Sequence, residues 1–515
     1  MRRKLTGAVV LTVALLSPAA CTSAVDQANQ ASTATNEASC QPGGTLTAAL
    51  ASPADPSAVL SGRPGNIFWV RNIVEPLWYI TKDSPEPKPL LAKSWKYEND
   101  NKTLVLTLQD GVKFHTGRAF TADDVVYTFS QVTKAGSPSN FGPIVSTWQV
   151  AATAPNTVTI TAPTALDQSA PSILDVTPII DKDTYAGIAS GKQIVGTGPF
   201  TLDTYTPGAA MTLKKNPNYW QADLPKLDKI DIPVIADSTA QLAALQSGRL
   251  QLASGLTVRD ATTAGDGTKF TLEKSGGIFY LLGMDITKAP LNNKQVRQAI
   301  AYAIDRERIN QQVFVGIGTT SDLMWPESSP GYPKDLATKY TYDPEKAKQL
   351  IASAGATGAT VDLTYAQQPI LASMYSIIAN NLEAIGLKPK GEALSIGDYQ
   401  QRVATASFKM SYLNNAASVG QSAPVLLATL PQIRLKNNSL GYDDPRFAEL
   451  SNAVTTATSA TSADALRKLT EYMLDEANVQ LIVAAPTTAV QAKNLTGVER
   501  TLTGSLFRNA CLTKP

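Results

Sequence analysis

In residues 91–129, turn-forming residues separate a strand pattern from a helix pattern. This regular order constrains the local fold more than any other stretch of the chain does. They read LAKSWKYENDNKTLVLTLQDGVKFHTGRAFTADDVVYTF. Residues 99–101 are turn formers, and residues 103–108 then alternate polar and apolar side chains with the period of two of a half-buried strand. Asp110 and Gly111 predict another turn. We therefore expect a strand over residues 103–108, bounded by turns.

The end of the same stretch predicts a helix. Thr121 has the side chain of an N-cap, and Asp123 and Asp124 follow where a first helical turn would carry acidic residues. A second acidic pair, Asp443 and Asp444, also stands at a turn or helix start. Structural roles explain both pairs better than catalysis does.

The N-terminus has the layout of a secretory signal. Residues 2–4 are basic, residues 5–16 are apolar, and Ala19 and Ala20 precede Cys21. The apolar run is too short to span a bilayer. A cysteine after small residues is typical of a lipidation site, although Pro18 stands where such sites usually carry leucine. Lipidation of Cys21 is favoured over simple cleavage, and both readings stay open.

Composition indicates an exported globular protein. Residues 22–39 are small and polar and predict a flexible tether. The chain has 515 residues with 43% hydrophobic content, which suits two to four domains of about 150 residues each. Its net charge is +2, with no basic run that would indicate nucleic acid. If Cys21 carries lipid, Cys40 and Cys511 remain as a disulfide pair; the alternative is two buried free thiols.

Further motifs follow in a fixed order. They are VGTGPF at residues 195–200, LKKNPNYW at 213–220, AALQSGRLQ at 243–251, APLNNKQVRQAIAYAIDRERINQQVFVG at 289–316 and YDPEKAKQLIASAG at 342–355. In the last, Asp343 has the residue type of an N-cap, Pro344 that of a first helical residue and Gly355 that of a helix end. Arg306 is expected to be solvated. With residues 91–129, these motifs resemble the peptide/nickel class (family 5) of solute-binding proteins that serve ABC importers.

This resemblance implies an α/β fold: a two-lobe periplasmic-binding-protein fold (class II, cluster C type) with an extra subdomain on the first lobe. Residues 1–20 would be the signal peptide and 21–40 the lipidated cysteine and tether. Lobe I would comprise residues 41–80, 195–288 and 485–515, with the additional subdomain at 81–194 and lobe II at 289–484.

No catalytic or metal-binding constellation is evident in the sequence. His115 is the one histidine and lies on an apolar strand, so a structural role is favoured over that of base or metal ligand. The serine-hydrolase and penicillin-recognising signatures are absent. We expect no enzyme, no cofactor and no metal.

The stretch from Met410 to Pro424 bears on the ligand. Peptide binders of the family place an aspartate here that pairs with the peptide's free ammonium. Here the matching position is Asn415 or Gly420, depending on the register, and no acidic residue occurs in the stretch. An amide brings no negative charge, so a free peptide N-terminus is not expected to bind by this route. Neutral or blocked peptides, sugars or other polar organic solutes remain; nickel is disfavoured.

Eight residues are candidates for contact with the ligand, each against an alternative of ordinary packing. They are Phe68, Trp69, Tyr280, Met284, Trp325, Tyr412, Asn414 and Asn415. Trp95 and Trp220 lie in scaffold motifs and are assigned to packing.

The main hypothesis is an extracytoplasmic, lipid-anchored and monomeric receptor that captures a peptide or other polar solute and delivers it to an ABC permease in the membrane. A surface sensor or interaction protein that retains the fold is the alternative, and a secreted hydrolase is the least favoured.

Overall fold

The computed structural model describes residues 40, 42–62, 64–327, 329, 331–417, 421–435, 438–458 and 460–513. Pro42–Pro515 form one unit, and Met1–Gln41 form another. The predicted signal peptide, Cys21 and the tether up to residue 39 lie outside the described residues, as does Gly420. No helix among the described residues is long and apolar enough to cross a membrane.

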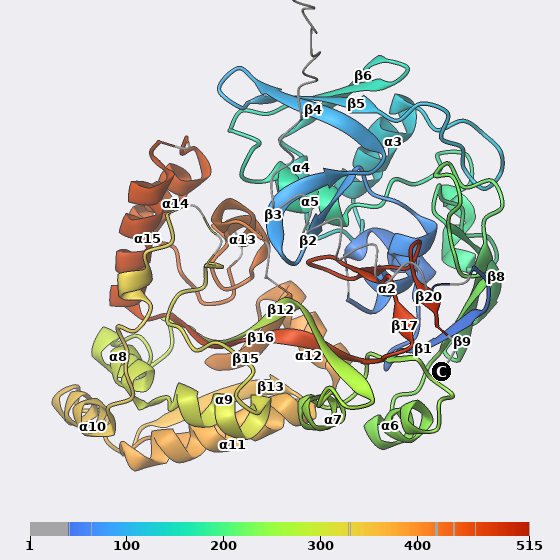
Figure 1. Ribbon diagram of the computed structural model, residues 1–515. Helices are drawn as coiled ribbons and strands as arrows, with labels where there is room; N and C mark the ends of the chain where they lie inside the picture. The colour runs from blue at the N-terminus through green and yellow to red at the C-terminus, as the bar shows by residue number, and fades with distance from the viewer. Residues whose placement is uncertain are drawn as a thin grey trace, which may run out of the picture. The chain divides into compact units, whose positions relative to one another are not determined.

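A ten-stranded mixed sheet runs through the larger unit (Figure 1). Its order is β14 (Lys388–Leu394), β13 (Thr360–Ala366), β15 (Ser411–Ala417), β12 (Phe270–Met284), β16 (Val479–Ala492), β11 (Leu252–Ala253), β1 (Thr45–Ala49), β10 (Lys229–Pro233), β9 (Ala210–Lys215) and β8 (Phe200–Thr206). In this order β1 and β8–β11 lie on one side of β12 and β16, and β13–β15 lie on the other; the two sides are called the first lobe and the second lobe.

Two long strands, β12 and β16, join the lobes. They pair antiparallel along almost their whole length, β12 also pairs with β15, and β16 pairs with β11. Their register shifts between Ser275 and Ile278, where Gly276 has φ +56°. A β-carbon on Gly276 would lie 2.6 Å from the Leu502 carbonyl oxygen, so this irregular crossing requires glycine.

A separate four-stranded antiparallel sheet is inserted between β1 and β8. Its order is β4 (Ala92–Glu98), β5 (Thr103–Leu108), β7 (Thr157–Thr161) and β6 (Gln149–Ala154), and β5 has the bounds that the alternation predicts. The accompanying helices are α3 (Ala122–Thr133), α4 (Gly142–Val145), α5 (Ala170–Val176) and the 3₁₀ helix η2 (Tyr185–Ser190). Thr121 is the N-cap of α3, as predicted, and its backbone N–H donates to Asp124 Oδ2 over 3.0 Å.

The first lobe also contains the helices and short strands near both ends of the larger unit. They are η1 (Pro56–Ser61), α2 (Pro64–Ile73), α6 (Ser238–Gln246), α7 (Val258–Ala264), β2 (Trp78–Thr81), β3 (Ser84–Pro89), β17 (Leu495–Thr496), β18 (Glu499–Arg500), β19 (Ser505–Leu506) and β20 (Cys511–Leu512). Cys40 and Cys511 are both disulfide-bonded, in agreement with the expected pair.

The remaining helices belong to the second lobe (Figure 1). They are α8 (Lys294–Ala303), α9 (Arg306–Phe314), η3 (Lys334–Leu336), α10 (Pro344–Ser353), α11 (Pro369–Ala384), α12 (Ile396–Thr405), α13 (Ala423–Thr429), α14 (Pro445–Thr455) and α15 (Ser462–Glu476). Asp343 caps α10 and Pro344 opens it, as predicted, and Asp444 caps α14.

The expectation that Arg306 is solvated is wrong. Its side chain is 8% exposed, lies 3.0 Å from Asp322 Oδ1, and donates to the Leu481 carbonyl oxygen over 2.8 Å. A helical-face pattern cannot reveal this, because β16 and the loop after α9 cover the arginine from distant parts of the sequence.

Two large hydrophobic clusters correspond to the lobes. One is formed by second-lobe residues with β12 and β16. The other unites the first lobe with the inserted subdomain, and it also includes Val425 of α13. This second-lobe side chain is fully buried, and α13 packs against α4. The two lobes are therefore also in contact through α13 and α4.

Candidate ligand-binding site

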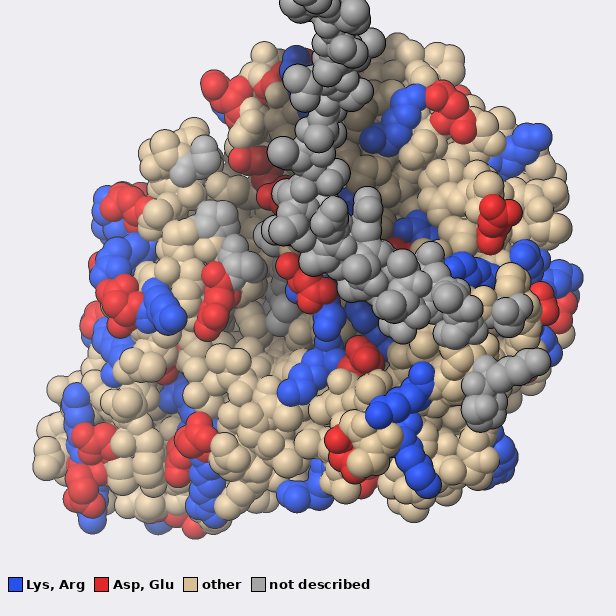
Figure 2. Space-filling view, in the orientation of Figure 1, with Lys and Arg blue, Asp and Glu red and all other residues tan. Residues whose placement is uncertain are grey.

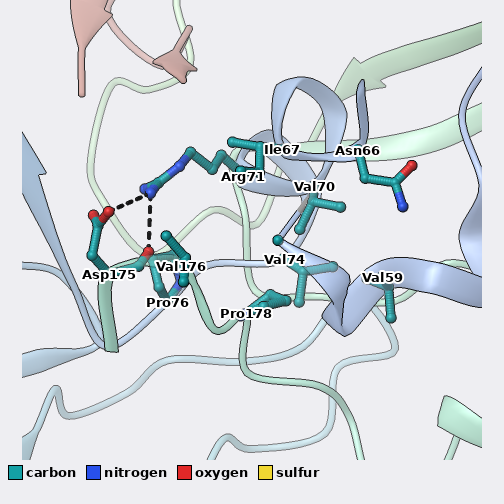
Figure 3. A pocket seen from close by; sticks show the side chains of 11 residues that line it. Val59, Asn66, Ile67, Val70, Arg71, Val74, Pro76, Asp175, Val176 and Pro178 are labelled. Carbon is teal, nitrogen blue, oxygen red and sulfur yellow. Dashed lines mark hydrogen bonds and ion pairs between the residues drawn. The ribbon is translucent and has the colours of Figure 1, made fainter. Parts of the chain in front are cut away.

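A hollow in the first lobe lies between η1, α2 and the segment that follows α5 (Figure 3). The space left in it is about 10 Å³, which is room for about one water molecule. Its lining residues are Val59, Gly62, Asn66, Ile67, Val70, Arg71, Val74, Pro76, Asp175, Val176 and Pro178. Most of this wall is apolar and branched, and the polar groups are few, as in small-molecule sites generally.

The charged part of the wall is a buried ion pair. Arg71 Nη2 lies 2.8 Å from Asp175 Oδ2, with the two side chains 4% and 2% exposed. Arg71 Nη2 also donates to the Asp175 carbonyl oxygen over 3.0 Å and to Thr503 Oγ1. The other carboxylate oxygen of Asp175 accepts the Ile80 backbone N–H over 2.9 Å. The acid is therefore fully engaged, and it neutralises the arginine.

The arginine is not fully engaged. Its Nε and Nη1 atoms are buried and have no hydrogen-bond partner. Leaving a buried donor without an acceptor costs about 1–3 kcal/mol. Both nitrogen atoms are sealed from solvent in this arrangement, so they present no donor to the space in the hollow.

Asn66 fixes the geometry of the opposite side. Its amide nitrogen donates to the Asp55 and Ala58 carbonyl oxygens over 2.8 and 3.0 Å, and its amide oxygen accepts from Asp55 N and Trp69 Nε1. Asn66 therefore ties η1 to α2 and has a structural rather than a ligand-binding arrangement.

The two predicted aromatic residues on α2 do not line the hollow. Trp69 is completely buried, and Phe68 packs on Phe507 with ring centroids 5.2 Å apart. Their neighbours Ile67, Val70 and Arg71 line the hollow instead. The predicted contact of Phe68 and Trp69 with ligand is not tested by this arrangement and stays a prediction.

Strands β12 and β15 bring five of the predicted residues together. Tyr280 is opposite Asn415 and Gly283 is opposite Tyr412 in the ladder, with Met284 at its end. Tyr280 packs against Phe314 with centroids 4.7 Å apart, and burial raises the pKa of its phenol to about 12. Met284 is fully buried.

Along β15, the exposure of the predicted side chains increases toward the C-terminal end of the strand. Tyr412 is fully buried and stacks on Phe408 at 3.7 Å, and its hydroxyl bonds Ser439. Asn414 is buried near Tyr399, whereas Asn415 is half-buried and donates to Gln368 Oε1 over 3.2 Å. Asn415 is thus the most accessible of the three predicted residues on this strand.

Trp325 lies apart from both groups. It is 3% exposed, and its indole Nε1 donates to Thr470 Oγ1 of α15 over 2.8 Å. The structure does not bring it to the hollow or to the β12–β15 pair, and its ligand contact stays a prediction.

None of the eight predicted residues is among those that line the hollow. Arg71 lies in a helix that is otherwise mostly apolar, and a lone cation on such a helix is a signal for a buried pair or a ligand contact. Its partner Asp175 is 104 residues away, so the pair itself leaves no local pattern. Among the described residues, no group of three or more His, Cys, Asp or Glu side chains could hold a metal ion.

Comparisons with known proteins agree on the family. The chain is 29% identical to the heme-binding protein A of Haemophilus influenzae over 87% of this chain and 88% of that protein. It is 27% identical to the glutathione-binding protein GsiB of Pectobacterium atrosepticum over 79% and 82% of the two chains. The periplasmic binding protein DppA of Helicobacter pylori, solved with the peptide STSA, superposes with a TM-score of 0.77 at 22% identity, covering 93% of this chain and all of that one.

The oligopeptide-binding protein AppA of Bacillus subtilis, solved with a nonapeptide, gives a TM-score of 0.75 at 21% identity, covering 92% of this chain and all of that one. These two structures show the two-lobe fold. Residues 86–432 match the family described as bacterial extracellular solute-binding proteins, family 5, middle part. The chain therefore belongs to the family 5 extracellular solute-binding proteins.

Proposed function

We propose that this protein is a lipid-anchored receptor that closes its two lobes around a polar organic solute and presents the closed form to an ABC permease. Solute capture for ABC import is the activity of its family. Two observations support a closing movement. Strands β12 and β16 join the lobes, and Val425 makes a separate contact with the first-lobe cluster. Hinged closure on a ligand needs both a connection that bends and a contact that can open.

The division of the chain supports the same proposal. Lobe I would comprise residues 41–80, 195–288 and 485–515, with the subdomain at 81–194, and lobe II residues 289–484. The bulge at Gly276 lies in the part of β12 that passes from one lobe toward the other, where a bend would be absorbed.

The class of solute follows from the charges near the lobe interface. The described part of the stretch from Met410 to Pro424 offers amide groups, Asn414 and Asn415, and no carboxylate. A buried ammonium needs a countercharge, so we propose that the solute is not a peptide held by its free amine. Relatives bind heme and glutathione by name, and a bound peptide is present in two of the solved structures, so the fold accommodates chemically different ligands.

Lipid anchoring through Cys21 and a monomeric state complete the proposal. The sequence supports an anchor because small residues precede Cys21 after a basic and an apolar segment. The face in view in Figure 2 intersperses Lys and Arg with Asp and Glu, without a large area of one sign among its described residues. A face of this kind provides no strong electrostatic attraction to an anionic membrane, and a covalent anchor would hold the protein there without it.

The test begins with the solute that co-purifies with the full chain, identified by native mass spectrometry. Adding that solute back to stripped protein should raise the melting temperature, and the rise should grow with the logarithm of the free solute concentration above the dissociation constant. Crosslinking to the permease should increase when the solute is present. Turnover of the solute, abolished by the loss of one carboxylate, would support a hydrolase instead. An interface between the lobes that accepts no solute would support the sensor.

Anchoring is tested separately. Labelling with a palmitate analogue should mark the wild-type chain and not the Cys21→Ser variant. A wild-type chain that is cleaved, exported and unlabelled would refute the anchor while leaving solute capture intact.

A further inference from the structure

We propose that Arg500 is a positioning residue for lobe closure. It fixes the first-lobe ends of β12 and β16, so that the two strands bend only at the step where two glycines face Pro486. The inference rests on the proposed function, and it adds what confines the bend to one place. The two strands run side by side through the middle of the molecule (Figure 1).

The step is an interruption in the pairing of the two strands. Residues 276 and 277 of β12 are both glycine, and they lie opposite the single residue Pro486 of β16, where the register shifts. Proline has no backbone N–H to donate across a sheet. Glycine allows the widest range of backbone angles. The ladder is therefore weakest and most easily bent at this step.

On one side of the step, both strands are bound to the second lobe. Strand β12 pairs with β15 from Ile278 to Met284. In β16, the Ala484 backbone exchanges two hydrogen bonds with Thr319, in the segment after α9, over 2.8 and 2.9 Å. The second lobe thus holds β16 up to two residues before Pro486.

On the other side of the step, Arg500 of β18 contacts both strands. Its Nε atom lies 3.5 Å from Glu273 Oε2 of β12, and its Nη2 atom donates to Gln491 Oε1 of β16. Its Nη1 atom donates to Ser505 Oγ of β19 over 2.7 Å. The Arg500 side chain is only 9% exposed. One planar guanidinium therefore holds both strands against the β18–β19 hairpin in a fixed arrangement.

The β18–β19 hairpin is itself held by the body of the first lobe. Asn72 of α2 donates to the Ser505 carbonyl oxygen over 3.1 Å. The Leu502 N–H donates to the Ile80 carbonyl oxygen over 2.9 Å. The Leu502 carbonyl oxygen lies against Gly276, only 2.6 Å from where a β-carbon on that glycine would be. The hairpin therefore reaches the step from the first-lobe side, and it carries Arg500 with the first lobe.

These contacts leave a short segment between two fixed ends. A few residues at the end of a structural element can absorb the backbone rotations of domain closure. Without Arg500, main-chain pairing alone would hold the first-lobe ends of β12 and β16, and the bend would spread beyond the glycine step. The lobes would then take a wider range of relative positions.

The test measures the distance between the lobes in the full chain, stripped of solute, by pulsed electron resonance between two spin labels. The labels replace Lys96 of β4 and Glu449 of α14, whose side chains are 75% and 67% exposed. Attachment through a non-natural ketone residue leaves Cys40 and Cys511 disulfide-bonded. We expect Arg500→Gln to widen the distribution of distances relative to the wild type. An unchanged width would overturn the proposal.

The matched control is Arg508→Gln. Arg508 and Glu499 form an ion pair within the first lobe, with side chains 8% and 23% exposed, against 9% and 24% for Arg500 and Glu273. Both variants should lower the midpoint of urea unfolding, because each leaves a largely buried acid without its partner. Only Arg500→Gln should widen the distance distribution. Equal widening in both variants would mean that Arg500 contributes stability alone, and it would refute the positioning role.

Should Arg500→Gln fail to fold, Glu273→Gln removes the charge on β12 and leaves the hairpin intact. It should also widen the distribution, and an unchanged width would contradict the proposal. Arg500→Lys keeps the charge but lacks the planar set of donors that reaches both strands. Its distribution should be wider than that of the wild type and narrower than that of Arg500→Gln, and a width equal to the wild type would refute the role of the guanidinium.

The co-purified solute separates this proposal from the receptor function. Adding the solute should narrow the distance distribution of the wild type, because closure selects one arrangement of the lobes. No narrowing would count against solute capture by closure. The comparison of solute-free chains would still decide whether Arg500 confines the bend.

Discussion

Val425 offers a direct measurement of how much the contact between the lobes contributes to ligand affinity. This α13 side chain is fully buried and belongs to the hydrophobic cluster of the first lobe. Opening of the lobes would expose it. The Val425→Ala variant removes two methyl groups, which at about 0.8 kcal/mol per buried carbon destabilises the closed state by about 1.6 kcal/mol. If the solute binds the closed state and the ligand-free chain is mostly open, its affinity falls by about 15-fold.

The assay is isothermal titration of stripped protein with the co-purified solute, paired with urea unfolding. The matched control is Val454→Ala on the neighbouring helix α14, where a valine of similar burial packs inside the second lobe. Val454→Ala should lower the free energy of unfolding and leave the affinity unchanged. Val425→Ala should lower the affinity, and small-angle scattering of the wild type should show a radius of gyration that falls when the solute binds, as expected for a ligand-free chain that is mostly open.

The reasoning is refuted if Val425→Ala binds the solute within twofold of the wild type while its unfolding free energy falls as much as that of Val454→Ala. That outcome would mean that α13 stays on the first lobe in both states. The closing movement would then have to take place elsewhere.

Four further predictions concern the scaffold. His115 accepts the Gly196 N–H at Nδ1 and lies 3.0 Å from the Gly198 carbonyl oxygen at Nε2, and burial lowers its pKa from 6.5 to about 4. Because the folded chain binds fewer protons than the unfolded chain in this range, the unfolding free energy should fall as pH drops from about 6.5 to 4, and His115→Gln should remove this slope. Burial raises the pKa of Glu75 above 4.5 despite hydrogen bonds from Tyr219, Trp220 and Thr197. The unfolding free energy of the wild type should therefore decrease as pH rises above about 4.5. Urea unfolding of Glu75→Gln from pH 4 to 8 should lack that decrease, and a slope identical to that of the wild type would contradict the prediction. Gly198→Ala would place a β-carbon 2.7 Å from the Ile73 carbonyl oxygen and should cost about 1–3 kcal/mol in urea unfolding, whereas Gly187→Ala, with nothing within 4 Å, should cost less. Loss of the disulfide in Cys511→Ser should lower the unfolding free energy by about 2–5 kcal/mol, and a wild-type chain that unfolds identically with and without reductant would argue against the bond.

Local elements could be predicted from the sequence because their determinants are neighbours in the chain. The alternation in residues 103–108 gives β5, Thr121 caps α3, and Asp343 caps α10. Arg306 shows the limit of the method, since the groups that bury it, Asp322 and the Leu481 carbonyl oxygen, come from other parts of the chain. A pattern along one helix records its faces and does not record what covers each face.

The candidate site was harder to predict for the same reason. Aromatic residues attract attention in a sequence, yet Trp69, Trp325 and Tyr412 are almost completely buried, each with a packing or hydrogen-bonding partner inside its own lobe. Large rings contribute most to stability when buried, so an aromatic residue alone is weak evidence for a ligand contact. The residues around the buried Arg71–Asp175 pair include no aromatic side chain, and they become neighbours only when the fold brings Asp175 to Arg71.

The family match and the hollow occupy largely different parts of the chain, and this bears on where specificity resides. The match covers residues 86–432, and within it His115 of one motif holds the glycine loop at Gly196 and Gly198 of another. Those contacts build the scaffold. Most of the wall around Arg71 comes from residues 59–76, before the match begins, and Thr503 comes after it ends. A scaffold that closes by bending β12 and β16 makes no demand on the chemistry of this wall. The motifs that identify the family therefore say little about the solute, and the fold superposes on proteins solved with peptides of different length.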